Sequence, residues 1–421
     1  MNYRLFHTRR LFHSTLHSRS LQFYQNKVIE DYANQAVNPA TLRQFIFFGR
    51  QMNLNRLVTS ANWVRNELLI RLAHRIRGFQ QLPFIVGSHP DVDEAYQDYC
   101  DTFQTFRQFP PCRTQEDNAQ FCQLLRDLLQ RGLRVPQRGL CESAALYPPD
   151  QHDLDLFLNR MLRSRISRQI LAKQHLALTE ACEHHTSLNY EGNVGIIFVN
   201  CSALEIVKSA QTLVYQGLKG EKPEIKVMLH QSQEGEIVFA YVPEQLESIL
   251  YELLDNAVRY SIRQKKKMVE VTVSANATDV YFRISDRAGG MTQDRYERLW
   301  SYQARARLGE FDYERISHES NNLGIGLMMS RIYAEYWGGE LQVITMDGHG
   351  TDVYVRIPRL GTNTENLGIT HPAFHDTTAK PGEEKIRLHS DPAPKTQTTQ
   401  LEWVDTSLTH KAFAGNSWSE K

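Results

Sequence analysis

The stretch Tyr251-Glu-Leu-Leu-Asp-Asn-Ala-Val-Arg259 is the part of the sequence that most strongly indicates the fold. It predicts a helix on which Glu252, Asn256 and Arg259, spaced i, i+4 and i+7, share one face. A carboxylate and a carboxamide one turn apart can hold a water molecule and a hard cation such as Mg²⁺, which binds few protein oxygens and keeps its waters and phosphates as further ligands. Taken alone, the same pattern is more often an exposed polar helix face.

Three further motifs follow in the same half of the chain. Ile284-Ser-Asp-Arg-Ala-Gly-Gly-Met291 is a predicted strand end that leads into a glycine turn, where an acid can accept from an exocyclic amine and the glycines let the backbone approach a ring. Asn321-Asn-Leu-Gly-Ile-Gly-Leu-Met328 leads into a helix whose free N–H groups form an anion cradle. Asp347-Gly-His-Gly-Thr-Asp352 is a turn between two strands. Taken singly, the first is an ordinary turn more often than a site, and the last is a hairpin turn.

Around these motifs, strands and helices are interspersed after Asn189. Helices are predicted over 203–215, from Pro243 onward and over 323–337, and a proline suits the first turn of a helix. Strands are predicted over 195–200, 224–229, 236–241, 269–274, 279–285, 340–345 and 351–357. Strands in adjacent pairs with isolated helices predict a mixed sheet with helices on one face. No G-x-G-x-x-G follows a strand, so a Rossmann domain is not supported.

From about Thr41 to Cys182 the pattern is helical. Residues 61–79 carry an apolar stripe, 82–90 breaks the helix, and 91–109 and 116–132 are two further predicted helices. A long helix over 153–182 has its apolar residues on one side: Leu154, Phe157, Leu158, Met161, Leu162, Ile166, Ile170 and Leu171. Four long helices with short connections predict an up-down bundle.

The two ends of the chain differ from the rest. Before the first acidic residue, Glu30, the sequence is rich in Arg, Ser and apolar residues, which is typical of a mitochondrial presequence, although a disordered basic start is the alternative. Residues 361–421 contain four prolines among Thr, Ser, Gly and charged residues without sustained periodicity, which predicts a mobile tail.

Composition limits the class of protein. The 421 residues suffice for two or three domains, and 48 Lys and Arg residues balance 48 Asp and Glu residues, which disfavours a dedicated nucleic-acid binder. The six cysteines form no CxxC motif, which indicates a reducing compartment or inert buried thiols. No uncharged apolar run approaches about 18 residues, so no membrane span is predicted.

In their order, the four motifs resemble the N, G1, G2 and G3 boxes of the GHKL ATPase and kinase superfamily. Further phrases, covering roughly 41 to 360, are similar to the mitochondrial 2-oxoacid dehydrogenase kinases, and those of the bundle are closer to the branched-chain kinase than to animal pyruvate dehydrogenase kinases. They are Leu72-Ala-His-Arg-Ile-Arg-Gly-Phe79, Leu82-Pro-Phe-Ile-Val-Gly87, Phe121-Cys-Gln-Leu124, Ser164-Arg-Ile166, His175-Leu-Ala-Leu178, Tyr333-Ala-Glu-Tyr336 and Gly350-Thr-Asp-Val-Tyr354.

The resemblance implies an α + α/β fold, with an amino-terminal up-down four-helix bundle followed by a GHKL-type α/β sandwich with a mixed sheet. With the two ends included, the expected domains are a mitochondrial presequence at 1–30, a regulatory and docking bundle at 41–185, an ATP-binding kinase domain at 190–360 and a mobile tail at 361–421. The implied partners are the E1α subunit of a 2-oxoacid dehydrogenase, the lipoyl domain of the E2 core and a second copy of the chain. The implied location is the mitochondrial matrix.

The activity that the resemblance implies is transfer of phosphate from ATP, with Mg²⁺, to a serine of E1α. Glu252 would be the general base, Asn256 would hold Mg²⁺, and Asp286 would bind the adenine amino group. The implied ATP-binding residues are Asn256, Arg259, Asp286, Gly290, Asn322, Leu323, Gly324, Gly326 and Thr351.

Some residues depart from the family's pattern. Ala288 and Asn322 stand where the family usually has Gly, and Arg305 and Ala306 replace a hydroxyl pair near the phosphates. Asn tolerates a positive φ, whereas Ala would be strained there. A catalytically weak ATP-binding regulator of the same complex is therefore the alternative, and a non-kinase GHKL ATPase is disfavoured by the bundle phrases. His175 lies on a predicted helix, and we expect a structural or interaction role for it rather than a role as phosphoacceptor.

We expect the acid-free start to be removed on import, up to roughly Asn26, because it serves targeting rather than packing. Sequencing the mature amino terminus from isolated mitochondria tests this. Bulk protein that keeps Met1 and remains in the cytosol would contradict it.

Overall fold

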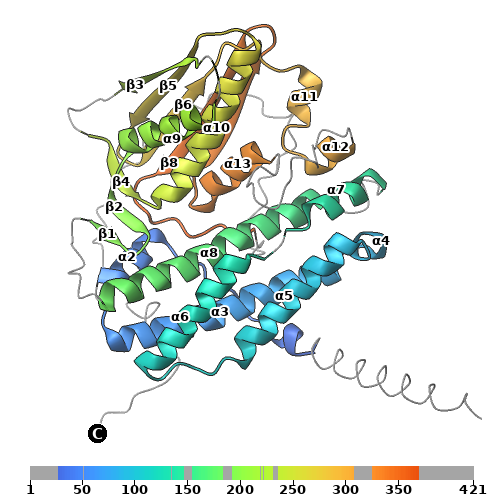
Figure 1. Cartoon of the computed structure of the whole chain (residues 1–421), viewed down its shortest axis with the longest axis vertical. Helices are drawn as coiled ribbons and strands as arrows, with labels where there is room; N and C mark the ends of the chain where they lie inside the picture. Colours follow the sequence, from blue (N-terminus) through green and yellow to red (C-terminus); the bar gives the residue numbers. More distant parts are fainter. Residues whose placement is uncertain are drawn as a thin grey trace, which may run out of the picture. The chain divides into compact units, whose positions relative to one another are not determined.

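The computed structural model of the chain describes residues 27–50, 52–133, 135–146, 154–183, 192–218, 220, 222–230, 236–307 and 325–368. The chain divides into two units, 1–368 and 369–421, and all described residues belong to the first. This unit contains a helical bundle followed by an α/β part, which confirms the predicted fold class (Figure 1).

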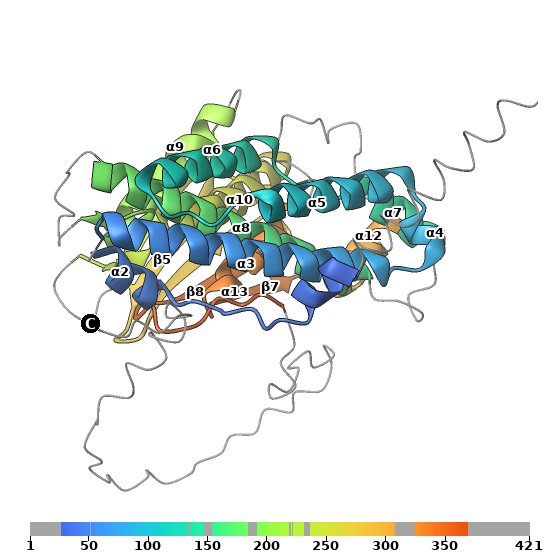
Figure 2. The same ribbon diagram turned by 90° about the horizontal axis from the view of Figure 1, so that it is seen from below.

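The bundle contains four long helices whose ends lie within one residue of the predicted ones, except that α3 begins seven residues before the predicted start at 61. They run side by side in Figure 2: α3 (Leu54–Gln80), α5 (Pro90–Gln108), α6 (Gln115–Arg131) and α8 (Leu154–Glu183). Three shorter helices complete this part: α2 (Leu42–Arg50), α4 (Phe84–Gly87) and α7 (Gln137–Leu146). The sequence does not predict α7, because a helix of ten residues is too short to show a sustained apolar stripe.

Local side-chain bonds fix the starts of the long helices. Asn53 caps α3, since its Oδ1 accepts from the backbone N–H of Arg56 at 2.9 Å. Thr114 and Asp117 form a capping box at the start of α6, where each side chain accepts from the other residue's backbone N–H. Pro90 occupies the first turn of α5. Because these caps are local in the chain, the boundaries can be predicted from the sequence.

The α/β part contains two sheets rather than the single mixed sheet expected. The five-stranded sheet has the order β3 (Glu224–His230), β5 (Met268–Ala275), β6 (Asp279–Ser285), β8 (Gly350–Pro358) and β7 (Glu340–Met346). In it β3 and β5 are parallel and the other neighbours are antiparallel. A smaller antiparallel sheet has the order β1 (Asn193–Val194), β2 (Ile197–Ser202) and β4 (Val238–Tyr241). The expected sheet is divided because β2 pairs with β4.

Helices cover one face of the five-stranded sheet (Figure 1). They are α9 (Ala203–Gly217), α10 (Pro243–Arg263) and α13 (Gly326–Tyr336), and the short α11 (Gln293–Glu297) and α12 (Tyr302–Arg307) lie between α10 and α13 in the chain. Strand residues alternate accordingly, so that Val271, Phe282 and Ile284 are fully buried while Thr272 and Arg283 point to the other face.

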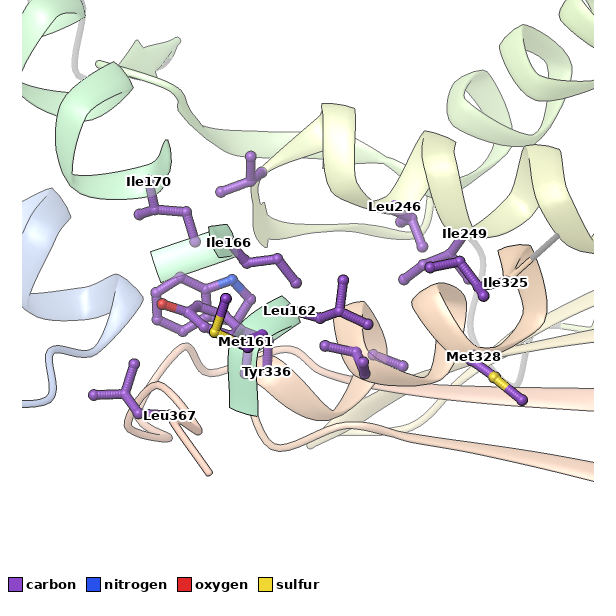
Figure 3. Close-up of a cluster of buried hydrophobic side chains, with 14 of the residues drawn as sticks. Met161, Leu162, Ile166, Ile170, Leu246, Ile249, Ile325, Met328, Tyr336 and Leu367 are labelled. Atoms are coloured by element: carbon purple, nitrogen blue, oxygen red, sulfur yellow. The ribbon is translucent and has the colours of Figure 1, made fainter. Parts of the chain in front are cut away.

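Buried side chains lie on all sides of helix α8, so the expectation that its apolar residues share one side is wrong. On the bundle side, Phe157 contacts Phe79 of α3 with ring centroids 5.3 Å apart. Leu162, Ile166 and Ile170 instead lie in a buried apolar cluster with side chains of α10 and α13 (Figure 3). Helix α8 therefore packs against the bundle on one side and against the α/β part on another, while Leu156 and Glu180 remain exposed.

Residues 361–368 belong to the folded unit, so the expected tail does not begin at 361. Thr364 forms a β-bridge with Thr41, and Leu367 and the Glu365 carboxylate are buried. Arg71 of α3 donates to both carboxylate oxygens of Glu365, at 2.6 and 3.0 Å. This buried ion pair holds a segment in which the sequence shows no periodic pattern. Residues 369–421 lie outside the described part of the chain.

Arg71 pairs with a second buried carboxylate as well. Its Nε donates to Glu67 at 3.2 Å, and the Glu67 side chain is also fully buried. Burial disfavours the charged form of Arg71, but the neighbouring Glu365 reverses the effect and raises the pKa of Arg71 well above its usual value. One buried guanidinium therefore compensates two buried carboxylates.

The expected presequence at 1–30 overlaps the folded unit. Residues 27–33 are helical, and Ile29 and Ala33 are part of the hydrophobic core. Residues 1–26 lie outside the described part of the chain. No helix among the described residues has both the length and the apolar composition that are needed to cross a bilayer.

We expect Arg71→Met to lower the free energy of unfolding by about 3–5 kcal/mol, because it leaves two buried carboxylates without their cation. Lys173→Met is the control, since Lys173 pairs with Glu244 at the surface and its loss should cost about 1 kcal/mol or less. Urea denaturation followed by circular dichroism measures both. Equal losses in the two variants would show that the Arg71 pairs do not stabilise the fold.

Candidate active site

Helix α10 carries Glu252, Asn256 and Arg259 on the face turned away from its apolar side. Leu250 and Leu254 are fully buried among the core residues and fix the rotation of the helix. Glu252 and Asn256 are half-buried and Arg259 is exposed. Of the three side chains predicted to share a face, two are therefore partly shielded from water and the third is exposed to it.

Glu252 lies against the first residue of α13. A methyl group at Gly326 would stand 1.9 Å from Oε2 of Glu252, so any larger residue there would displace the carboxylate. No group in the described part of the chain donates a hydrogen bond to this carboxylate. Burial raises the pKa of Glu252, and the nearby Asp255 adds to the effect while Arg259 opposes it. A carboxylate with a raised pKa and no donor is suited to accept a proton from a ligand.

Asn256 offers an amide that is not engaged elsewhere, since no described residue bonds to its side chain. Arg259, its neighbour on the same face, donates through Nε to Asp255 at 2.6 Å. Asp255 was not among the predicted site residues, although its i, i+4 spacing from Arg259 is the signal that predicts this ion pair. The pair leaves the Asn256 oxygen free for a hard cation such as Mg²⁺.

Asp286 follows β6 and is buried. Its Oδ1 accepts from the backbone N–H groups of Ala288 at 2.9 Å and Thr351 at 3.2 Å. Within the described residues no donor reaches Oδ2, so this oxygen can accept from the amine of a ligand. Burial raises the pKa of Asp286, and the two backbone hydrogen bonds oppose the shift.

Two glycines allow the turn after β6 to approach the turn between β7 and β8. A methyl group at Gly290 would lie 2.2 Å from the carbonyl oxygen of Met346, and one at Gly350 would lie 2.2 Å from the carbonyl oxygen of Asp286. The left-handed conformation occurs at Gly289 and Gly290 but not at Ala288. The backbone strain considered for Ala288 is therefore absent.

The predicted phosphate loop is only partly described. Asn322, Leu323 and Gly324 lie outside the described residues, whereas Gly326 begins α13 and Ile325, the residue before it, provides no side-chain cap. The unbonded N–H groups of this helix start favour an anion. Arg305 and Ala306 lie on α12, and Ala306 is buried.

The structure thus brings the predicted residues together in two groups. Glu252 meets Gly326 at the start of α13, and Asp286 meets Thr351 and Gly290 at the ends of β6 and β8. Helix α10 packs on β5 and β6, so Glu252 lies in the helical layer and Asp286 lies at the end of a strand in the sheet that this layer covers. A carboxylate acceptor for a ring amine, a free amide oxygen and a helix start that favours anions suit a nucleotide with a metal ion.

Two contacts at the rim of the Asp286 group are not predictable from the sequence. Arg287 bonds His349 across the two turns, with 2.7 Å between guanidinium and imidazole nitrogens. Thr345 accepts from the backbone N–H of Met291 at 2.9 Å and fixes the glycine turn. Neither contact has a sequence signal, because the partners lie more than fifty residues apart in the chain.

His175 lies apart from both groups and has a structural environment. Its ring nitrogens contact Ser60 at 3.0 Å and Asn118 at 2.9 Å inside the bundle. Burial lowers the pKa of His175 to about 4. A fully buried imidazole with both nitrogens engaged agrees with the structural role expected for it.

Comparisons with known proteins match both parts of the chain. Residues 39–198 match the family model described as mitochondrial branched-chain alpha-ketoacid dehydrogenase kinase, and residues 241–361 match the one described as histidine kinase-, DNA gyrase B- and HSP90-like ATPase. The mitochondrial [pyruvate dehydrogenase (acetyl-transferring)] kinase 2 of Saccharomyces cerevisiae is 28% identical, and the match covers 82% of this chain and 87% of that protein.

Two further relatives carry similar names. The mitochondrial [pyruvate dehydrogenase (acetyl-transferring)] kinase of Arabidopsis thaliana is 28% identical over 83% of this chain and 99% of its own length. The mitochondrial isozyme 1 of Homo sapiens is 26% identical over 82% of this chain and 83% of its own length. The similarity therefore spans both the bundle and the α/β part.

We expect Asp286→Ala to weaken the binding of adenine nucleotides with or without Mg²⁺, because it removes the acceptor for the adenine amine. Asn256→Ala should weaken Mg-ATP more than metal-free ATP, because it removes an oxygen ligand of the metal. Isothermal calorimetry with ATP in Mg²⁺ and in EDTA measures both. Unchanged Mg-ATP affinity in the two variants would disprove this assignment of the site.

Proposed function

Because the chain belongs to the mitochondrial 2-oxoacid dehydrogenase kinase family of the GHKL superfamily, we propose that it is an ATP-dependent protein-serine kinase that phosphorylates and thereby inactivates the E1α subunit of a 2-oxoacid dehydrogenase complex. The observation that carries the proposal is the half-buried Glu252 carboxylate, which has no described donor, lies against Gly326 and shares a helix face with Asn256. A general base beside a metal ligand is what phosphoryl transfer to a hydroxyl requires.

Of the two complexes considered, we propose the pyruvate dehydrogenase complex as the preferred substrate. The relatives whose names contain pyruvate dehydrogenase match across more than four-fifths of this chain. The branched-chain description is attached to a match of 39–198 only. Incubating the protein and labelled ATP with each purified complex in parallel distinguishes the two, and faster labelling of the branched-chain E1α would reverse the preference.

In the proposed reaction Glu252 takes the proton from the serine hydroxyl. The serine oxygen then forms a bond to the γ-phosphorus while the bond between that phosphorus and the β,γ-bridging oxygen breaks, and ADP leaves. The raised pKa of Glu252 makes the carboxylate a stronger base than an exposed one. Asp286 holds the adenine end of ATP. Positioning of the bound substrates then supplies most of the reduction in the activation barrier.

Asn256 is the proposed ligand of Mg²⁺, and its unengaged side-chain amide and half-buried position fit a hard cation. The bound ion would neutralise charge on the ATP phosphates. Arg259 lies one turn further along the same face and, through its pair with Asp255, has a fixed guanidinium at the rim of the site. The amino end of α13 adds a partial positive charge for the phosphates.

We further propose that the bundle docks the lipoyl domain of the E2 core, as the family resemblance implies. Two large apolar side chains near the start of the bundle, Phe47 on α2 and Leu54 on α3, are 60% and 49% exposed, which supports a docking surface there. Docking would raise the local concentration of E1α around the kinase. Calorimetry with a lipoylated domain tests this, and equal binding by Phe47→Asp and the wild type would exclude that surface.

A homodimer is proposed on similar grounds. The uncovered face of the five-stranded sheet has exposed apolar side chains on β7 and β8, among them Ile344, Met346 and Tyr354. A second copy of the chain would remove them from water. Sedimentation equilibrium tests the proposal, and a monomer at micromolar concentration would contradict it.

We propose the mitochondrial matrix as the location, because the relatives are named as mitochondrial and the start of the chain is free of acidic residues. The alternative function is a catalytically weak, ATP-binding regulator of the same complex. Arg305 and Ala306 favour it, because they replace the hydroxyl pair that the family has near the phosphates.

We expect Glu252→Gln to keep ATP affinity but to lower kcat about 10²–10⁴-fold, because the amide keeps the size of the carboxylate and cannot accept the serine proton. The wild-type kcat should fall as the pH decreases through the raised pKa of Glu252, since the base must be ionised. Transfer of ³²P to E1α between pH 5 and 9 measures both.

Glu247→Gln is the control for this substitution, because Glu247 lies on the same helix and bonds Ser209 at the surface. It should leave kcat unchanged. Wild-type activity that survives Glu252→Gln would refute the role of the base, whereas a wild type that binds ATP and barely transfers phosphate would favour the regulator.

A further inference from the structure

We propose that Glu365 is a positioning residue for this reaction: it anchors the carboxyl-terminal end of α13 to helix α3 of the bundle and thereby keeps Gly326, at the other end of α13, against Glu252. The inference rests on the proposed function, because it assigns a task to the surroundings of the proposed base. Glu365 touches no reacting group itself.

The anchor consists of a single buried carboxylate with partners from three parts of the chain. Tyr336, the last residue of α13, donates its hydroxyl proton to Glu365. Arg71 of α3 donates to both carboxylate oxygens, and the backbone N–H of Ala40 donates to Oε1 at 3.0 Å. The hydroxyl of Tyr336 is fully buried. Burial raises the pKa of this hydroxyl well above the usual value, and the charge of Glu365 adds to the shift. The hydroxyl therefore stays protonated and remains a donor.

The same end of α13 has two further attachments. Glu335 forms an ion pair with Arg163 of α8. Trp337, the residue after α13, donates from Nε1 to Oε1 of Gln245 on α10 at 3.0 Å. The carboxyl end of α13 is thus held by α3, α8 and α10, whereas Ile325 leaves its amino end without a side-chain cap.

Helix α13 transmits this restraint as a short rod. It has eleven residues and a length of about 16 Å at 1.5 Å per residue. Met328 and Tyr336 lie in the buried apolar cluster between α8, α10 and α13 (Figure 3). Apolar contacts of this kind lack direction, so they allow a helix to tilt or slide slightly, whereas the Glu365 bonds fix its end at one position.

The other end of the rod meets the base with almost no free space. Gly326 leaves less than the room for a methyl group beside Oε2 of Glu252. A small displacement of α13 would therefore open the space around Glu252 to water or push the carboxylate aside. A misplacement of about 1 Å far from the chemistry can cost about 10²-fold in rate. Through Glu365 the bundle sets the geometry of the base.

The test uses Glu365→Gln and Tyr336→Phe in the full chain. Both keep the shape of the side chain, and Glu365→Gln leaves Arg71 matched by Glu67, so the fold is preserved. We expect each variant to lower kcat roughly tenfold or more while the KM for ATP changes less than about twofold, because Asp286 lies on a different element. The double variant should be no worse than the worse single variant, because both remove the same contact.

A second readout separates positioning from general stability. If Glu252 becomes exposed, its pKa falls toward the ordinary value, and the acid limb of the kcat profile moves to lower pH. Asp117→Asn is the matched control, because it weakens the capping box of α6 in the bundle and touches neither α13 nor the site. It should lower the urea midpoint without changing the pH profile.

The titration of the Glu252 carboxyl is followed by ¹³C NMR, with Glu252→Gln for assignment, and needs no turnover. A wild type without kinase activity would refute the proposed function but leave this measurement valid. We expect a lower titration midpoint in Glu365→Gln and Tyr336→Phe than in the wild type. Identical midpoints and identical pH profiles in the wild type and the two variants would overturn the inference.

Discussion

The attachment of the bundle to the α/β part depends on the buried charge of Arg71. Its guanidinium bonds Glu67 on the same helix and Glu365 on the segment after the last strand. A charged group in the protein interior is tolerated only when it is paired and hydrogen-bonded, so these three side chains must stay together. Because Glu365 also bonds Tyr336, the requirement to keep Arg71 neutralised ties the segment 361–368, helix α3 and helix α13 into one arrangement.

The apolar packing and the ionic contact have different roles in this arrangement. Helix α8 has buried side chains on all its sides and packs through Leu162, Ile166 and Ile170 in the apolar cluster that it shares with α10 and α13 (Figure 3). Burial of apolar area is strong but not directional. Hydrogen bonds and ion pairs contribute less net free energy, yet they fix the register of the helices that they join. The polar contacts therefore set the position of α13 relative to Glu252.

The site combines features that act in opposite directions on its charges. Burial raises the pKa of both Glu252 and Asp286, which favours their protonated forms. Backbone N–H groups stabilise the ionised Asp286, and Arg259 stabilises the ionised Glu252. The result is one carboxylate, Asp286, held by fixed backbone donors and one, Glu252, to which no described residue donates. The departure at Ala288 does not disturb this geometry, since the left-handed positions are Gly289 and Gly290.

The sequence by itself determined the features that depend on neighbours along the chain. Apolar periodicity predicted the long helices and most strands, and local caps such as Thr114 and Asp117 fix the helix starts in the structure. The spacing of Glu252, Asn256 and Arg259 gave their common helix face, and the order of the four motifs indicated the nucleotide site. The periodicity, the caps and the spacing are properties of consecutive residues, along which backbone geometry repeats, and the motif order is a property of the chain itself.

Only the tertiary structure decided which distant residues meet. Three features have no signal in the sequence. Buried side chains lie on all sides of α8, Gly326 leaves the space that the Glu252 carboxylate occupies, and β2 pairs with β4 outside the main sheet. Glu365 is the clearest case, because it lies in a polar stretch expected to be mobile and becomes fully buried against an arginine 294 residues away in the chain. The attraction between two charges depends on the distance and the dielectric between them, and the folded chain sets both.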